Sequence, residues 1–324
     1  MKISAIQACT VGVRDLPQAL ALFRDVMRLG VEHEGPLSRS LLTGWGVPSD
    51  TTARYAELSA GGYGIGRLRL VEYSPPASQA VRLDHGDGGG DSPTDIGPKA
   101  IDFYVADPIL PRVREIGAAG YRFRSPPIRH VIANTESEEC LFSGPDGVPI
   151  LLMVGHRHSP RELRPGCLDV GPYSEIATIS VVAGDLEASR ALYEDLFGFE
   201  LLVDAETGQA HRRGANTLTG VPDGTRIQFR VYAEPGQASG KILLVHFFER
   251  TGRRLDGRMR PGRLGFSLMS HAVDNLDAAH ERARALGIRV LVDPVSVDYV
   301  DGMSRIMLIE GPSGECFELV EKAG

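Results

Sequence analysis

The sequence has few cysteines, few aromatic residues and no long apolar run, and each shortage excludes a class of protein. Its four cysteines form no C-x-x-C pair and three lie in strand-like segments, which predicts reduced thiols rather than a disulfide framework. No apolar run approaches the ~20 residues that a membrane-spanning helix needs. Arg14 and Asp15 come too early for a signal peptide. We therefore expect a cytoplasmic protein without a membrane partner.

Positive charge is also scarce. The chain has 35 Lys and Arg against 42 Asp and Glu, so its formal net charge is -7. Nucleic-acid binding needs a basic surface that neutralises phosphates. The most Arg-rich stretch, residues 249–263, is interrupted by Gly and Pro and is typical of a solvated loop. We therefore expect no nucleic-acid partner.

What the sequence does contain is an internal repeat. Residues 12–30 read GVRDLPQALALFRDVMRLG, and residues 182–200 read VAGDLEASRALYEDLFGFE. Both place Asp-Leu after a β-rich run, and both continue into a helix-forming segment that Leu-Gly or Phe-Gly ends. Two further pairs of segments repeat at nearly the same spacing, residues 105–121 with 273–289 and residues 144–152 with 311–319. Three concordant spacings indicate a duplicated half-chain.

Each half divides again. Asp15 and Asp107 lie 92 residues apart, and Asp185 and Asn275 lie 90 residues apart. Each of these side chains can accept an unpaired backbone N–H at the start of a helix. A strand precedes each predicted helix and three strands should follow it. The sequence therefore predicts an α+β fold of four βαβββ modules, at residues 3–74, 97–155, 175–248 and 263–322.

This pattern resembles the vicinal oxygen chelate superfamily, which includes glyoxalases, bleomycin-resistance proteins and extradiol dioxygenases. The resemblance rests on the strand, Asp-Leu, helix and Leu-Gly sequence, and on the Gly-Pro-x-Gly turn before an apolar strand that ends in ELVE. It implies two tandem domains, residues 1–155 and 175–324, joined by a linker at residues 156–174. Paired modules would each curl eight strands into a cup-shaped mixed sheet. Pairing within the halves or across them stays open at this point.

The resemblance also implies where a metal would be held. The family's first-strand ligand lies seven residues before the Asp that caps the helix, and its last-strand ligand is the Glu of a Glu-Leu pair. Those positions here are Ala8, Ala100, Thr178 and Leu268 on the first strands, and Arg69, Leu151, Leu243 and Glu318 on the last. Fe(II) in such a dioxygenase needs two His and one carboxylate. We therefore expect no cofactor; the alternative is Fe, Zn or Mn bound by shifted ligands such as His130, His246 or His271 with Glu318.

Glu318 is the predicted catalytic residue. It lies between Phe317 and Leu319 on a strand, so it faces the cup, where burial would raise its pKa and suit it to general-base chemistry. Arg69 would stabilise an oxyanion, although we expect it in the other cup. The alternative interpretations are a structural ion pair for Glu318 and an exposed side chain for Arg69. The other predicted substrate-binding residues are Ala8, Ala100, Leu151, Thr178, Leu243, Leu268, Tyr299 at the cup mouth, and His130.

These features favour an enzyme that acts on a small apolar or aromatic metabolite by metal-independent general acid and base chemistry, of the isomerase, lyase or cyclase type. A protein that only binds and sequesters such a molecule is one alternative, because the cups persist without the metal ligands. A metal-dependent dioxygenase or glyoxalase-like enzyme with shifted ligands is the other. The predicted partner is a small-molecule ligand, and a homodimer is left open.

Overall fold

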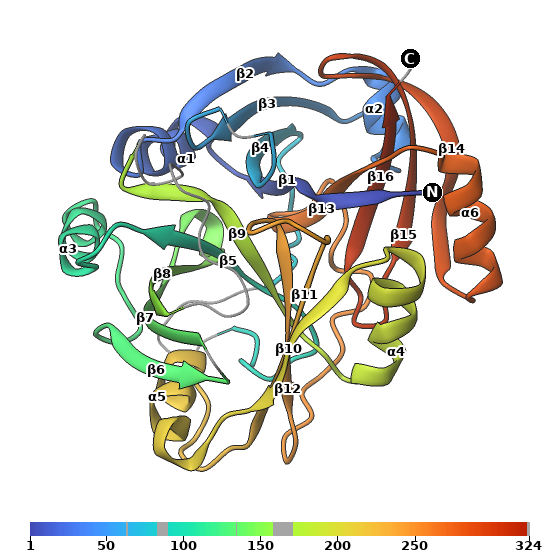
Figure 1. The fold of residues 1–324 in the computed structure, drawn as a ribbon. Helices are drawn as coiled ribbons and strands as arrows, with labels where there is room; N and C mark the ends of the chain where they lie inside the picture. Colours follow the sequence, from blue (N-terminus) through green and yellow to red (C-terminus); the bar gives the residue numbers. More distant parts are fainter. Residues whose placement is uncertain (63, 83–89, 134, 158–170, 323–324) are drawn as a thin grey trace.

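The computed structural model describes residues 1–62, 64–82, 90–133, 135–157 and 171–322. In these ranges, sixteen strands form two mixed eight-stranded sheets with short helices at their periphery (Figure 1). The α+β class and the four βαβββ modules are confirmed.

The first two modules follow the predicted order. Module 1 contains β1 (Ile3–Val13), α1 (Leu16–Leu20), the π-helical η1 (Ala21–Val26), β2 (Gly30–Pro36), α2 (Arg39–Gly44), β3 (Thr52–Ser59) and β4 (Arg67–Ser74). Module 2 contains β5 (Gly97–Val105), α3 (Leu110–Ala118), β6 (Ile128–Ile132), β7 (Thr135–Ser143), the 3-10 turn η2 (Pro145–Gly147) and β8 (Pro149–Arg157).

The last two modules repeat this plan. Module 3 contains β9 (Tyr173–Val182), α4 (Leu186–Arg190), the π-helical η3 (Ala191–Leu196), β10 (Glu200–Glu206), α5 (Gln209–Thr219), β11 (Ile227–Ala233) and β12 (Lys241–Phe247). Module 4 contains β13 (Gly265–Val273), α6 (Leu276–Ala285), β14 (Arg289–Tyr299), β15 (Gly302–Glu310) and β16 (Cys316–Lys322). Modules 1 and 3 share an insertion that the sequence did not predict, the helix α2 or α5 between their second and third strands.

Helix capping accounts for three of the four predicted helix starts. The side chains of Asp15, Asp185 and Asn275 accept backbone N–H groups in the first turns of α1, α4 and α6. The predicted cap at Asp107 is wrong, because α3 begins at Leu110 and its N-cap residue makes no side-chain hydrogen bond. Instead, α3 has Pro111 in its first turn, where a missing backbone N–H removes no helical hydrogen bond.

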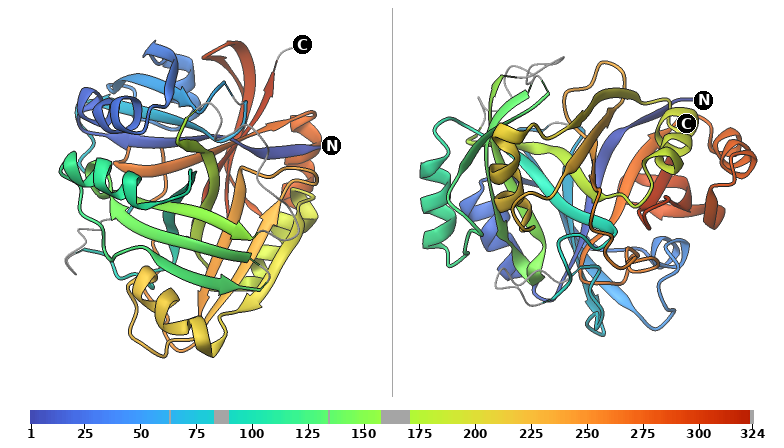
Figure 2. Two further views of the ribbon diagram at one scale, coloured as in Figure 1. Left: turned by 60° about the vertical axis from the view of Figure 1, so that its left-hand side comes forward. Right: turned by 90° about the horizontal axis from the view of Figure 1, so that it is seen from below.

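The sheets pair modules across the two halves. One sheet has the order β14-β15-β16-β13-β1-β4-β3-β2 and joins modules 1 and 4; the other has the order β10-β11-β12-β9-β5-β8-β7-β6 and joins modules 2 and 3. The colours of Figure 2 show the same grouping, blue with red and green with yellow. Each sheet thus takes one module from either side of the predicted division at residues 1–155 and 175–324, which answers the open question of pairing; the division itself stays a prediction. Residues 158–170 of the predicted linker lie outside the described residues.

The helices that follow the first strands, in contrast, contact one another within the halves. α3 of module 2 contacts η1 of module 1, and α6 of module 4 contacts η3 of module 3. The inserted helices α2 and α5 pack across the halves, on β14 and β6. One large apolar core therefore includes residues from both sheets.

Two glycines join the sheets at their centres. Gly66 donates to the carbonyl of Ile6 and accepts from the N–H of Ile176, and Gly240 makes the mirrored pair of bonds with the same two residues. Both glycines have positive φ, of 66° and 70°. A Cβ on Gly66 would lie 2.5 Å from the carbonyl oxygen of Ile176. Only glycine fits these two junctions.

Candidate functional site

Each sheet has one concave site, and the two sites differ in chemistry. We call the site of modules 1 and 4 the first cup and the site of modules 2 and 3 the second cup. The predicted site residues are divided between them: Arg69, Ala8, Tyr299 and Glu318 belong to the first cup, and Ala100, His130, Leu151, Thr178 and Leu243 belong to the second.

In the first cup, Glu318 is held by three donors. It is fully buried on β16. Its Oε1 accepts from the indole N–H of Trp45 at 2.6 Å, and its Oε2 accepts from the hydroxyls of Ser270 at 2.6 Å and Tyr299 at 2.9 Å. A general base needs a free lone pair that faces its substrate. With both oxygens occupied, this arrangement does not favour the predicted role.

Arg69 completes the network beside Glu318. Its Nε and Nη2 lie 2.8 and 2.7 Å from Oε2 of Glu57, and its Nη1 lies 4.0 Å from Glu318. Arg67 holds the other oxygen of Glu57 at 2.7 Å. Burial would raise the pKa of Glu57, but Arg69 and Arg67 outweigh it and hold that pKa below its ordinary value. Two carboxyl and two guanidinium groups thus occupy the first cup together.

The placement of Arg69 and Glu318 in one cup corrects the expectation that they lie in different cups. It follows from the pairing of module 1 with module 4. Ala8 and Tyr299 line a cleft of about 550 Å³ above this network. The predicted contact Leu268 is wrong for this cleft: it is buried in the apolar core, and Ser270 occupies the position that pairs with Glu318. The family's first-strand position, counted as seven residues before Asn275, falls on Leu268, whereas Ser270, which pairs with Glu318, lies five residues before Asn275.

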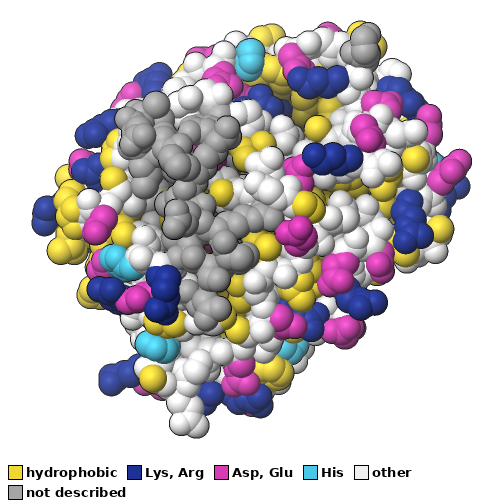
Figure 3. Space-filling model, in the orientation of Figure 1, with side chains coloured by type: hydrophobic (Ala, Val, Ile, Leu, Met, Phe, Trp, Pro, Cys, Tyr) yellow, Lys and Arg dark blue, Asp and Glu magenta, His cyan; other side chains and the backbone are white. Residues whose placement is uncertain are grey.

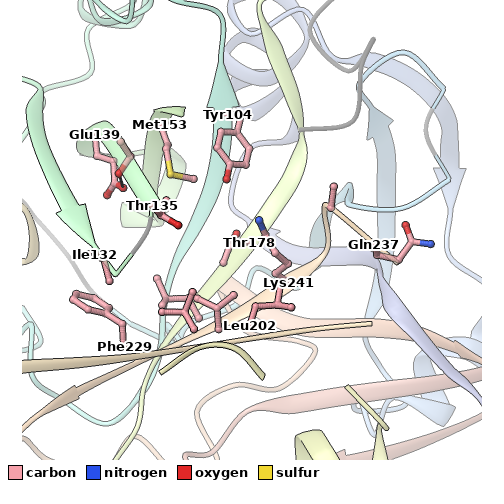
Figure 4. A pocket seen from close by; sticks show the side chains of 15 residues that line it. Tyr104, Ile132, Thr135, Glu139, Met153, Thr178, Leu202, Phe229, Gln237 and Lys241 are labelled. Atoms are coloured by element: carbon pink, nitrogen blue, oxygen red, sulfur yellow. Dashed lines mark hydrogen bonds between the residues drawn. The ribbon is translucent and has the colours of Figure 1, made fainter. Parts of the chain in front are cut away.

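The second cup contains a larger and more apolar cavity. Its outer part has a volume of about 760 Å³ and its inner part about 600 Å³. Both parts are lined by Ile132, Glu139, Met153, Phe229 and Leu243, so they form one continuous site. Figure 4 shows Glu139 and Met153 on one side, Phe229 and Leu202 across from them, and Thr178 and Lys241 between. Five predicted residues therefore line one cavity, although their functional roles stay predictions.

Asp102 lies at the inner end of this cavity. It is on β5, where it pairs with Thr178 of β9 and Leu151 of β8. Its Oδ2 accepts from the Ser180 hydroxyl at 2.8 Å, while its buried Oδ1 has no hydrogen-bond partner among the described residues. Burial raises its pKa to about 8; the hydrogen bond from Ser180 opposes this most, repulsion from Glu139 adds to it, and two lysines oppose it to a smaller extent. At pH 7 this carboxyl group is therefore mostly protonated.

His130 and Glu139 form an ion pair in the same cavity. The Nε2 of His130 lies 3.1 Å from Oε1 of Glu139, and the Ser137 hydroxyl donates to that oxygen at 2.5 Å. Burial would lower the pKa of His130, but the neighbouring carboxylate outweighs burial and raises it. The cavity thus places a carboxyl group of raised pKa near an imidazole–carboxylate pair, within apolar walls.

The sequence analysis missed Asp102, Ser180 and Glu139. A signal for the first two was present. Asp102 is two residues from Ala100 on the same strand, and Ser180 is two residues from Thr178, so period-2 alternation puts each pair on one face. A lone Asp in the apolar run Ala-Ile-Asp-Phe-Tyr-Val is also unusual for a buried strand. Glu139 had no comparable signal, because Glu136, Glu138 and Glu139 are all close together on one strand.

The family's metal site does not fit these residues. Within the described ranges, no group of three or more His, Cys, Asp or Glu is arranged to hold a metal ion. The shifted set is also corrected: His130 and His246 are on the second sheet, whereas Glu318 is on the first. His271 pairs with Leu319 on β16, and its Nδ1 contacts the carbonyl of Ser4 at 2.8 Å. The four candidate ligands therefore do not meet at one site.

The comparisons with known proteins agree with this fold. Residues 175–319 match the model of the Glyoxalase/Bleomycin resistance protein/Dioxygenase superfamily. The matched segment spans modules 3 and 4, and the chain is similar to that superfamily over this segment. A search of curated proteins finds no match.

Solved structures resemble the full length of the chain. Glyoxalase I from Zea mays matches at a TM-score of 0.60 with 16% identity, covering 98% of this chain and 92% of that chain. A mutant form of the same Zea mays enzyme matches at 0.65 with 14% identity, covering 98% and 92%. A putative dioxygenase from Bacillus subtilis matches at 0.57 with 11% identity, covering 100% and 86%. At these identities the likeness shows the fold alone.

Two surface findings bear on partners. In the described part of the chain, no helix is long and apolar enough to cross a membrane. On the face drawn in Figure 3, Lys and Arg side chains are interspersed with Asp and Glu side chains. That mixture is typical of a solvated surface rather than a phosphate-binding one.

Proposed function

We propose that the chain is an enzyme that binds a small, largely apolar or aromatic metabolite in the second cup and transfers a proton to or from it through Asp102, without a metal. The observation that supports this most is the Asp102 carboxyl group itself. It is fully buried, its Oδ1 lacks a partner among the described residues, and it lines an apolar cavity. We accordingly transfer the role predicted for Glu318 to Asp102.

The cavity walls support this class of substrate. Phe229, Leu243, Leu151 and Met153 present apolar surface on opposite sides of the site. Flat, apolar molecules gain most from such walls, because each buried Å² contributes about 25 cal/mol. A carbonyl or hydroxyl oxygen on the substrate would meet Oδ1 of Asp102, which otherwise stays unpaired at a cost of roughly 1–3 kcal/mol.

The raised pKa of Asp102 supports this chemistry. In its neutral form, Asp102 can donate its proton to a substrate oxygen, and in its ionised form it can accept a proton from carbon next to a carbonyl. The Ser180 hydroxyl holds the other carboxyl oxygen and so fixes the orientation of the group. The His130–Glu139 pair lines the same cavity, and His130, with its pKa raised, offers a second proton donor. Proton removal and return without oxidation suits an isomerase, lyase or cyclase.

The test measures carbon–hydrogen exchange directly. The protein is incubated in D₂O with aryl ketones such as phenylacetone and 2-indanone, and NMR follows deuterium uptake next to the carbonyl. We expect exchange above the buffer rate in the parent, and loss of about 100-fold or more of that excess in Asp102→Asn. Asp25→Asn, a change of the same type at an exposed position, should behave as the parent. Glu318→Gln tests the earlier assignment, since loss there with retention in Asp102→Asn would contradict the proposal.

Sequestration is the second candidate function. The apolar cavity of the second cup favours it, since burial of apolar surface alone provides affinity. Binding of the ketones by calorimetry, without exchange and without dependence on Asp102, would support this interpretation over catalysis.

A further inference from the structure

A third cleft lies outside both cups. It has a volume of about 990 Å³ and lies between the end of α2, the outer strands β14 and β15, and residues 78–79 and 260–263 of the segments that connect the modules. Its lining shares no residue with the cavities of the first or second cup, although the indole of Trp45, which lines it, donates to Glu318 of the first cup. A cleft of this size accommodates a small organic molecule.

Positive charge accumulates in this cleft. Arg260 and Arg263 both line it. Arg260 pairs with Glu310, but the same carboxylate also holds Arg289 at 2.7 Å. Among the described residues, the side chain of Arg263 makes no ion pair or hydrogen bond. The carboxylate of Glu310 therefore pairs with both Arg260 and Arg289, and Arg263 has no carboxylate partner among the described residues.

The electrostatics of Arg263 agree with that geometry. Partial burial, followed by repulsion from Arg260 and Arg258, lowers the pKa of its guanidinium, and no carboxyl group opposes this effect. Arg258 is itself paired with Asp91 at 3.0 Å. A half-buried cation beside like charges gains from an anionic ligand, which would supply the missing counter-charge. This local excess is unusual for a chain of net charge -7.

The remaining walls of the cleft are apolar. Trp45, Leu291, Val292 and Leu308 line it beside the two arginines. We propose that this cleft binds a small organic anion, with Arg263 as the counter-charge and these four side chains as the apolar wall. Its anionic group is a carboxylate or a phosphate, since both accept the guanidinium hydrogen bonds in the same way.

Trp45 gives the proposal a built-in reporter. It is the only tryptophan of the chain, it lines the cleft, and it is 3% exposed. A ligand that contacts the indole should change its fluorescence. The full-length protein is titrated with phenyl phosphate and phenylacetate, with inorganic phosphate as the anion alone and 2-phenylethanol as the apolar part alone. Calorimetry measures the same affinities independently.

We expect saturable binding of at least one of the two aryl anions, weakened by added salt and weakened about tenfold or more by Arg263→Gln. The tighter of the two identifies the anionic group. Arg250→Gln, a matched change at an exposed arginine of the same connecting segment, should leave binding unchanged. Arg263→Lys should retain part of it, which separates loss of charge from loss of fold.

Three results would overturn the proposal. They are the absence of binding by both aryl anions, equal affinity for the neutral 2-phenylethanol, and unchanged affinity in a folded Arg263→Gln variant. Because Arg263 lines neither cup, its effect also distinguishes this cleft from binding in the second cup.

Discussion

Asp102 should make the stability of the chain depend on pH in the direction opposite to that of an ion-paired carboxyl group. An ion-paired Asp has a lowered pKa and stabilises the fold at neutral pH. The pKa of Asp102 is raised to about 8 from 3.8, so the folded chain retains a proton that the unfolded chain has lost. Between these two values the free energy of unfolding therefore falls as pH rises.

The magnitude follows from the shift. One extra proton bound in the folded state lowers the free energy of unfolding by about 1.4 kcal/mol per pH unit. Over the whole window this amounts to on the order of 5 kcal/mol, which is a large part of the stability of an ordinary domain. Asp102→Asn removes the titration while keeping an oxygen that can accept from Ser180. The variant should therefore become more stable relative to the parent as pH increases.

The assay is equilibrium unfolding in urea at pH 5, 6, 7 and 8, for the parent and for Asp102→Asn. Subtracting one from the other largely cancels other titrating groups, including His130, whose raised pKa gives a slope of the same sign. Asp25→Asn is the matched control: the pKa of exposed Asp25 is lowered, so its effect lies below this range. A difference between parent and Asp102→Asn that stays constant from pH 5 to pH 8 would refute the reasoning.

Three further predictions concern the junction and the cups. Gly66→Ala should destabilise the chain by about 3 kcal/mol or more in urea unfolding, because its Cβ meets the carbonyl of Ile176. The control Gly62→Ala, at a residue with positive φ but open space around it, should cost about 1–2 kcal/mol. Equal losses of stability in the two variants would contradict the steric argument. Glu318→Ala should cost about 3–5 kcal/mol, because it leaves Arg69 and three donors without their buried partner; a loss below 1 kcal/mol would contradict the structural role. Leu243→Trp should fill the second cup and abolish binding of the aryl ketones with little change in the melting temperature, whereas retained affinity would place their site elsewhere.

Local sequence signals were sufficient for the elements but not for their pairing. Asp15, Asp185 and Asn275 cap their helices because a short polar side chain after a strand has few other roles. Pairing depends on which first strands meet, and four similar modules offer similar strands. Contacts far apart in the chain decide it, including the bridges Ala80–Leu264 and Ile96–Arg254 between the two connecting segments. No local pattern encodes such contacts.

The candidate site was missed for a different reason. The family's metal-ligand positions fall on Ala100 and Leu151, which are apolar, and not on Asp102 beside them. Five lining residues were still found, because the same positions face the cavity whether or not they bind a metal. The hydrogen bonds that occupy Glu318 were not predictable, since their donors come from the end of α2, from β13 and from β14.

The two cups share one serine position, but the carboxyl group that the serine contacts lies on a different strand in each cup. Ser180 and Ser270 lie at matching positions of β9 and β13, 90 residues apart, and each donates to a buried carboxyl group. In the first cup that group is on the last strand, where Trp45, Tyr299 and Arg69 surround it. In the second cup it is Asp102 on the first strand.

The residue that pairs with Asp102 on the last strand is Leu151. Leu243 occupies in module 3 the position of Arg69 in module 1. No guanidinium group holds Asp102 as Arg69 holds the first-cup network, and Lys241 and Lys99 offset the effect of burial only in part, so the Asp102 pKa rises. The same scaffold therefore places a carboxyl group held by three donors in one cup, and in the other a carboxyl group whose Oδ1 has no hydrogen-bond partner among the described residues.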